Sequence, residues 1–187
     1  MENQKVQSRE KLIKLVTAAM FAAMICVMTA VVHINTVVGG YINLGDCFIL
    51  IAAWVLGPVY GFAAAGIGSA FADMFLGYVN YIPGTFIIKG LMALVAALIV
   101  HIFIKKSGKL RIPGYITSGI AAEILMVGGY YLYEAAALGL GWAPALKGIP
   151  GNTVQGVSGV VLGVFFSVII AQTKLLKKVH YDYSYAI

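Results

Sequence analysis

Four acidic residues lie inside stretches that are otherwise almost wholly apolar, and a lysine lies in a fifth such stretch. They are Asp46, Asp73, Glu123, Glu134 and Lys89. A charge at the centre of a bilayer costs roughly 2.5–3.5 kcal/mol on insertion scales, so a membrane chain that keeps several usually uses them. Carboxylates and an ammonium group can hold a polar ligand through hydrogen bonds, or they can relay protons.

The composition predicts an integral membrane protein with a single domain, residues 1–187. Hydrophobic residues make up 61% of the chain and charged residues 11%, whereas soluble domains carry about 25% charged residues. The mean hydropathy is +0.92. The first apolar run is long enough to cross a membrane and no small-residue cleavage site follows it. We therefore expect a membrane helix there and not a signal peptide.

Apolar stretches of about 20 residues mark the expected membrane spans. The stretch at 41–77 could form one helix or two helices separated at Gly57-Pro58, because Pro removes a helix hydrogen bond and Gly tolerates a turn. Basic residues decide between these readings: 11 of the 13 fall in three patches, at 5–14, 105–111 and 174–178. Only six spans put all three patches on one side. The expected spans are about 12–32, 41–57, 59–77, 84–104, 115–138 and 152–174.

The positive-inside rule makes the side with the basic patches the cytoplasm. The fold class predicted is therefore an all-α membrane protein, a six-transmembrane-helix bundle with both termini cytoplasmic. We expect it in the cell membrane as a multi-pass protein of a bacterial plasma membrane. The same placement explains the net charge of +6 as cytoplasmic flanks in contact with the bilayer, so no nucleic-acid partner is expected.

This topology brings polar side chains from five helices to one level, just below the outer surface. Residues spaced by three or four share a helix face, which pairs Tyr130 with Glu134 and Asn152 with Gln155. Glu123 shares the Tyr130 face but lies deeper. Aromatic rings among a few polar groups suit a small, flat, hydrogen-bonding ligand. The predicted substrate-binding residues are Asn43, Asp46, Asp73, Lys89, Tyr130, Glu134, Asn152 and Gln155.

Simpler interpretations stay open for these residues. Asp46 or Glu134 could pair with Lys89 as a neutral structural bridge, and tyrosines could belong to an interfacial aromatic belt. Ala18, Ala19, Ala22 and Ala23 are spaced for close helix approach. Their partner could be another protein or another helix of this chain.

Enzyme chemistry is not expected, because the known signatures are missing. The sequence has no G-x-x-x-x-G-K-[ST] phosphate loop, no H-E-x-x-H and no G-x-S-x-G. Its two cysteines and three histidines show no metal-ligand spacing, so we predict no metal and no cofactor. A membrane pocket without an ATPase motif suggests a binding subunit that relies on partner proteins for energy.

Four segments resemble the substrate-binding (S) components of energy-coupling factor (ECF) vitamin transporters, in the broad riboflavin-type group. Residues 40–46 read Gly-Tyr-Ile-Asn-Leu-Gly-Asp, and 52–58 read Ala-Ala-Trp-Val-Leu-Gly-Pro. Residues 66–73 read Gly-Ile-Gly-Ser-Ala-Phe-Ala-Asp, and 81–91 read Tyr-Ile-Pro-Gly-Thr-Phe-Ile-Ile-Lys-Gly-Leu. The resemblance implies a six-helix bundle that captures a water-soluble vitamin or precursor from outside for ATP-driven uptake.

The resemblance also implies partners. An S component docks on a transmembrane T component and two cytoplasmic ATPases as the substrate subunit of an ABC importer. The alanine-rich face of the first helix is the family's docking surface, and the loop at 35–40 would cover the pocket. Pyridoxine-, hydroxymethylpyrimidine- or riboflavin-type ligands are expected, and anionic ligands fit less well because the acids outnumber Lys89 and Lys147. The alternative function is a self-contained proton-coupled carrier, which would use the buried carboxylates as a relay.

Overall fold

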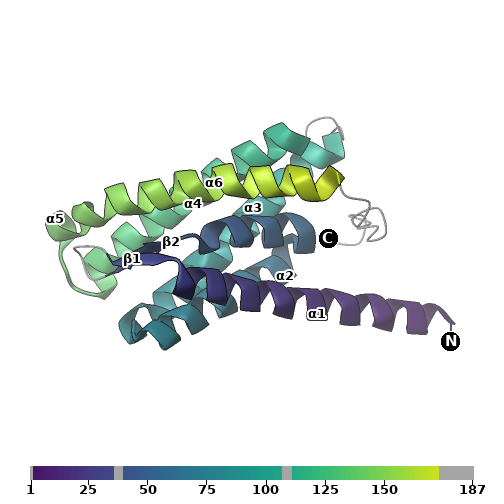
Figure 1. Ribbon diagram of the computed structural model, residues 1–187, viewed down its shortest axis with the longest axis horizontal. Helices are drawn as coiled ribbons and strands as arrows, with labels where there is room; N and C mark the ends of the chain where they lie inside the picture. Colours follow the sequence, from purple (N-terminus) through teal and green to yellow (C-terminus); the bar gives the residue numbers. More distant parts are fainter. Residues whose placement is uncertain (1, 36–39, 107–110, 173–187) are drawn as a thin grey trace.

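The computed structural model is almost entirely helical and describes residues 2–35, 40–106 and 111–172 (Figure 1). A two-stranded antiparallel ribbon, β1 and β2, interrupts the helices near the N-terminal third of the chain. In chain order the elements are α1 (Glu2–Val31), β1 (His33–Asn35), β2 (Tyr41–Asn43), α2 (Gly45–Leu76), η1 (Val79–Tyr81), α3 (Ile82–Lys106), α4 (Arg111–Leu132), η3 (Tyr133–Ala137), α5 (Trp142–Ala145), η4 (Leu146–Gly148) and α6 (Ile149–Gln172).

The long helices run between two ends of an elongated bundle. Figure 1 places the start of α1 and the end of α6 at one end, on the right, and β1, β2 and α5 at the other. Within the described ranges, five helical stretches are long and apolar enough to cross a membrane. They are Val6–Val31, Gly45–Leu76, Val79–Ile104, Arg111–Ala137 and Trp142–Ile170.

The second of these stretches, α2, is broken in its middle. Gly57 has φ 76° and ψ −174°, outside the helical region, and Pro58 follows it. Glycine reaches a positive φ without steric cost, and proline cannot donate the next helix hydrogen bond. A Cβ at Gly61 would stand 3.1 Å from the Cα of Ala53, so the chain reverses at Gly57 and the two arms of α2 pack on each other. The predicted division at Gly57-Pro58 coincides with this break.

The predicted start of the second span, at residue 41, is wrong. Tyr41–Asn43 forms β2, paired with β1 through the registers His33 to Asn43 and Asn35 to Tyr41. The helix begins only at Gly45, whose backbone N–H donates to Asn43 Oδ1 at 2.8 Å. This local hydrogen bond gives Asn43 a turn-forming role that competes with helix. Residues 36–39 of the predicted covering loop, and the last two of the sixth predicted span, lie outside the described residues.

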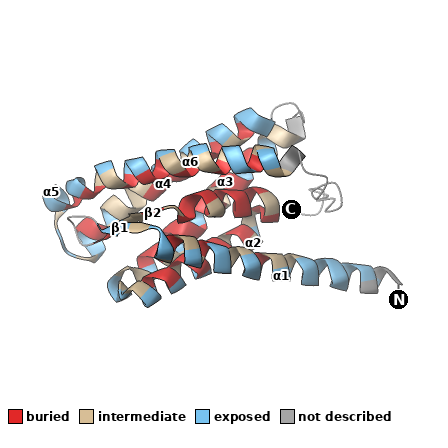
Figure 2. Ribbon diagram, viewed as in Figure 1, coloured by how far each residue is buried: buried red, intermediate tan, exposed pale blue. Residues whose placement is uncertain are grey.

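The core lies where α2 is packed between α1 and α3, and Figure 2 shows α2 as the most continuously buried helix. Ile49 and Leu50 of α2, Met92 of α3 and Met126 of α4 are fully buried. The outward faces carry many exposed aliphatic and aromatic side chains. Lipid chains are as apolar as these residues, so such faces are expected of membrane helices.

Candidate functional site

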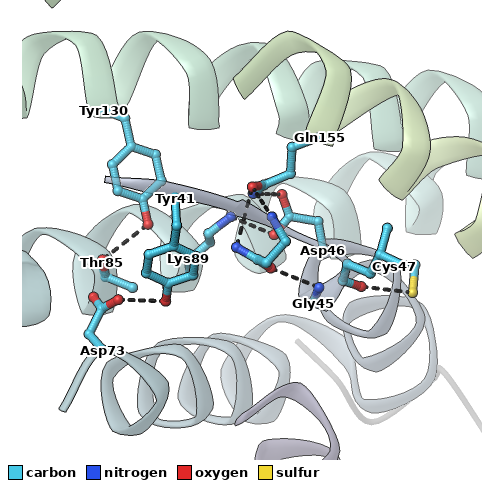
Figure 3. A network of polar contacts seen from close by, with 11 residues as sticks. Tyr41, Gly45, Asp46, Cys47, Asp73, Thr85, Lys89, Tyr130 and Gln155 are labelled. Carbon is cyan, nitrogen blue, oxygen red and sulfur yellow. Dashed lines mark hydrogen bonds and ion pairs between the residues drawn. The ribbon is translucent and has the colours of Figure 1, made fainter. Parts of the chain in front are cut away.

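A buried ion pair joins two helices below the strand end of the bundle. Lys89 Nζ on α3 lies 2.5 Å from Asp46 Oδ1 on α2, and the two residues are 3% and 0% exposed. The other oxygen, Asp46 Oδ2, accepts a hydrogen bond from Gln155 Nε2 of α6 at 2.6 Å (Figure 3). Lys89 also lies 5.5 Å from the ring centre of Tyr130. Charges taken out of water are stable only when paired in this way.

The same network fixes the strand ribbon onto α6. Gln155 Oε1 accepts from the backbone N–H of Asn43 at 2.8 Å and from Asn43 Nδ2 at 3.3 Å. Gln155 thus uses its amide nitrogen on Asp46 and its amide oxygen on Asn43. One glutamine therefore connects β2, α2 and α6, so Asn43 and Gln155, each predicted to bind substrate, also hold these elements together.

A second set of polar contacts involves three tyrosines. The Tyr41 hydroxyl donates to Asp73 Oδ1 at 2.7 Å, and the Tyr81 hydroxyl donates to Glu134 Oε1 at 3.3 Å. The hydroxyls of Thr85 and Tyr130 lie 3.0 Å apart. Burial, together with the Asp73 carboxyl, raises the pKa of Tyr41 far above its usual range, so Tyr41 stays protonated and donates.

These groups surround one cavity whose empty volume is about 480 Å³, including the part open to solvent. Residues from α1, β2, the C-terminal end of α2, η1, α3, α4, η3, η4 and α6 line it, together with Gly40 just before β2. They are Thr29, Gly40, Tyr41, Asn43, Asp73, Tyr81, Thr85, Lys89, Tyr130, Glu134, Gly148, Asn152 and Gln155.

Seven of the eight predicted substrate-binding residues line this cavity. The exception is Asp46, which holds Lys89 and Gln155 from behind. The sequence left open whether Asp46 or Glu134 pairs with Lys89, and the structure shows that Asp46 does. Glu134 instead accepts a hydrogen bond from the Tyr81 hydroxyl. Whether these residues bind a substrate stays a prediction.

Glu123 lies apart from the cavity, as its deeper position predicted. It packs against α6: a Cβ at Gly159 would stand 2.6 Å from Glu123 Oε1 and 3.0 Å from Asp46 Cβ. The two acids are therefore close neighbours. Among the described residues, neither Glu123 oxygen has a hydrogen-bond partner.

Sequence reasoning missed Tyr41, Tyr81 and Thr29 as cavity residues. Tyr41 was placed in a helix, where its side chain would have pointed elsewhere. As part of β2 it alternates with Ile42, and its ring packs against Tyr78 at 4.9 Å between centroids. The one sequence signal was the position of Tyr41 close to the Asn-Leu-Gly-Asp segment at 43–46. That signal points to the cavity only if Tyr41 lies in a strand.

Glu134 is positioned by an irregular stretch of helix. Residues 133–137 form the π-helical turn η3 directly after α4. π-helical turns are rare and occur often at functional sites, because the extra residue rotates the side chains that follow. Here the turn presents Glu134 to the cavity and lets the Tyr133 hydroxyl donate to the Asn80 carbonyl at 2.7 Å.

The alanine face of α1 is divided between two environments. Ala18 is buried and Ala22 is half-buried, and a Cβ at Gly68 of α2 would stand 2.5 Å from the Ala22 carbonyl oxygen. Ala19 and Ala23 are exposed. All four line a wide apolar groove between α1 and the second arm of α2. Close internal packing therefore accounts for part of the small-residue pattern, and docking of a partner stays a prediction.

Across the described ranges, no group of three or more His, Cys, Asp or Glu side chains is arranged to hold a metal ion. Lys89 would also oppose a cation next to Asp46.

Comparisons with known proteins relate the chain to a family. One relative, an uncharacterized protein in the gap 3′ region of Pyrococcus woesei, is 35% identical over 124 residues, which is 66% of this chain and 78% of that protein. The solved structure of the S component of a bacterial ECF transporter matches with a TM-score of 0.64 at 20% identity, covering 86% of this chain and 96% of that one. At that identity the match shows a shared fold. A family model described as ECF-type riboflavin transporter, S component, matches residues 9–172. The chain therefore belongs to the S-component family of ECF transporters, multi-pass membrane proteins that serve as substrate-binding subunits and not as enzymes.

Proposed function

We propose that this chain captures a water-soluble vitamin or vitamin precursor from outside the cell for ATP-driven uptake. Its ligand would be a heteroaromatic compound of pyridoxine, hydroxymethylpyrimidine or riboflavin type. Tyr41, Tyr81 and Tyr130 supply ring surfaces, and the polar groups between them supply hydrogen bonds. The observation that carries the proposal is the cavity, because seven independently predicted polar residues line it.

In the proposed topology the chain crosses the cell membrane six times. Both of its termini then lie in the cytoplasm. The reversal at Gly57 supports it, since it divides α2 into two arms. The cavity then opens at the outer end of the bundle, beside β1 and β2. One domain, residues 1–187, would form the whole unit.

The proposed partners are an ECF transmembrane T component and two cytoplasmic ATPases. Support comes from family membership and from the apolar groove along α1, where Ala19 and Ala23 are exposed between bulkier residues. Exposed small residues let a second membrane helix approach closely. Ala18 and Ala22 would help by holding α1 close to α2.

Mass spectrometry of small molecules released from the purified, detergent-solubilised chain tests the proposal. A stoichiometric heteroaromatic vitamin is the expected result. Lys89→Ala and Glu134→Ala should each weaken binding at least tenfold, about 1.4 kcal/mol. Normal binding by both variants would show that the ligand occupies another site.

Reconstitution distinguishes the alternative function. An S component binds its ligand alone but supports uptake into vesicles only with its T component and ATPases. The buried carboxylates Asp46 and Glu123, which lie side by side, are the feature that a proton-coupled carrier would use. Uptake by the chain alone that stops on addition of an uncoupler would establish that carrier instead.

A further inference from the structure

Two carboxylates of the cavity are only half satisfied. Asp73 uses Oδ1 to accept from Tyr41, and Glu134 uses Oε1 to accept from Tyr81. Among the described residues, neither Asp73 Oδ2 nor Glu134 Oε2 has a hydrogen-bond partner. Thr85 is a neighbour of Asp73, and its hydroxyl lies 3.0 Å from the Tyr130 hydroxyl.

These free oxygens are unusual because both residues are deeply buried. Asp73 is 2% exposed and Glu134 is 3% exposed, and both line the cavity. Most buried polar atoms have a hydrogen-bond partner, and exceptions in native structures call for an explanation. A carboxylate oxygen without a donor loses the stabilisation that water gave it. The cavity therefore presents two acceptors that a ligand can satisfy.

The charge balance of the cavity points the same way. Lys89 is the cationic residue of the lining, and it is already paired with Asp46. Its charge is therefore offset before Asp73 and Glu134 are counted. In their ionised forms, the two remaining acids leave an excess of negative charge in a region of low dielectric, where opposite charges attract strongly. A cation is the ligand charge that this arrangement favours.

The two acids reach the cavity from different elements. Asp73 lies near the end of α2, and Glu134 lies in the π-helical turn η3. Tyr41 donates to Asp73 Oδ1 and Tyr81 donates to Glu134 Oε1. These hydrogen bonds orient the two carboxylates. A ligand with donors on more than one side of a ring can therefore contact both acids while the tyrosine rings contact its faces.

Building on the proposed function, we propose that the cavity selects a cationic nitrogen heterocycle whose charged N–H groups bind the free oxygens of Asp73 and Glu134. Neutral analogues keep some donors but lose the charge attraction. Anionic analogues meet two carboxylates with no free cation to balance them. The site thus discriminates by charge as well as by ring shape.

Titration calorimetry of the purified full chain with charge-matched compounds tests this inference. Pyridoxamine, pyridoxine and 4-pyridoxic acid share one ring and differ at one substituent, which is an ammonium, a hydroxyl or a carboxylate. Thiamin and its monophosphate test the effect of ring charge without a charged N–H group, and riboflavin and its monophosphate compare a neutral compound with an anionic one. We expect a cationic compound to bind at least tenfold more tightly than its neutral or anionic counterpart.

Conservative variants locate the source of the preference. Asp73→Asn and Glu134→Gln remove a charge each with little change in shape, and each should reduce the preference for the cation to about threefold or less. Glu10→Gln, at an exposed position on α1, removes an acid far from the cavity and should leave the preference intact.

Each outcome decides a different point. A neutral or anionic compound that binds most tightly would overturn the charge inference and leave the proposed function standing. A cation preference that survives both cavity variants would overturn the assignment to Asp73 and Glu134. Failure of every compound to bind would overturn the proposed function, and this inference with it.

Discussion

Replacing Lys89 with methionine should destabilise the protein strongly. Lys89 Nζ lies 2.5 Å from Asp46 Oδ1 between α2 and α3, with both residues buried. Methionine has a similar length but no charge, so Lys89→Met leaves Asp46 buried with Gln155 as its remaining hydrogen-bond donor. An uncompensated buried charge, and not the loss of packing, is then the source of the destabilisation.

The expected magnitude follows from the burial of both partners. Removing one partner of a buried ion pair costs about 3–5 kcal/mol, whereas removing both charges together is often nearly neutral. For a chain of this size, about 1 kcal/mol corresponds to roughly 2–4 °C in Tm. Lys89→Met should therefore lower Tm by about 6–20 °C. The double variant Asp46→Asn, Lys89→Met should regain more than half of that loss.

The thiol of Cys47 offers a direct assay. Cys47 adjoins Asp46, is 2% exposed, and is the sole cysteine once Cys26 is changed to serine. Its reaction with a thiol-sensitive fluorophore during heating reports the opening of this part of the bundle. A Tm loss below about 2 °C for Lys89→Met, or a double variant as unstable as the single one, would refute the reasoning.

Three further predictions concern other parts of the bundle. Glu123→Gln should keep or raise Tm in the same thiol assay, since neither Glu123 oxygen has a donor among the described residues; a loss above about 2 °C would contradict this. Gly68→Ala should lower Tm because its Cβ would stand 2.5 Å from the Ala22 carbonyl oxygen, whereas Gly128→Ala, with nothing within 4 Å of its Cβ, should be neutral or stabilising by about 0.5–1 kcal/mol; equal effects would show that α1 is not in close contact there. Trp54→Phe loses a 3.0 Å hydrogen bond to a buried serine and should cost about 1 kcal/mol; an unchanged Tm would argue against that bond.

Much of the bundle was predictable because membrane helices are encoded in long apolar runs. The break at Gly57 was predictable too, since Gly-Pro is a strong local signal and the basic patches required a reversal. The order of the spans then placed Lys89, Tyr130 and Gln155 at one level of the bundle. These features depend on residue type and spacing alone.

The details that the sequence left undetermined depend on tertiary contacts. Strands of three residues, such as Tyr41–Asn43, are too short to show an alternating pattern. The π-helical turn around Glu134 has no residue signature. The choice of Asp46 over Glu134 as the partner of Lys89 depends on the exact register between α2 and α3. Each of these differences shifts a side chain by a few ångströms, which is enough to change its partner.

The charged residues of the site separate into two groups with different expected roles. Asp46, Lys89 and Gln155 satisfy one another and connect α2, α3 and α6, so their main contribution is to hold the bundle together. Asp73 and Glu134 each have an oxygen without a hydrogen-bond partner at the cavity, so we expect them to contribute mainly to ligand binding. Substitutions in the first group should therefore lower Tm more than they change ligand discrimination. Neutral isosteres in the second group should change discrimination while Tm stays within about 2–4 °C, the shift that about 1 kcal/mol produces in a chain of this size.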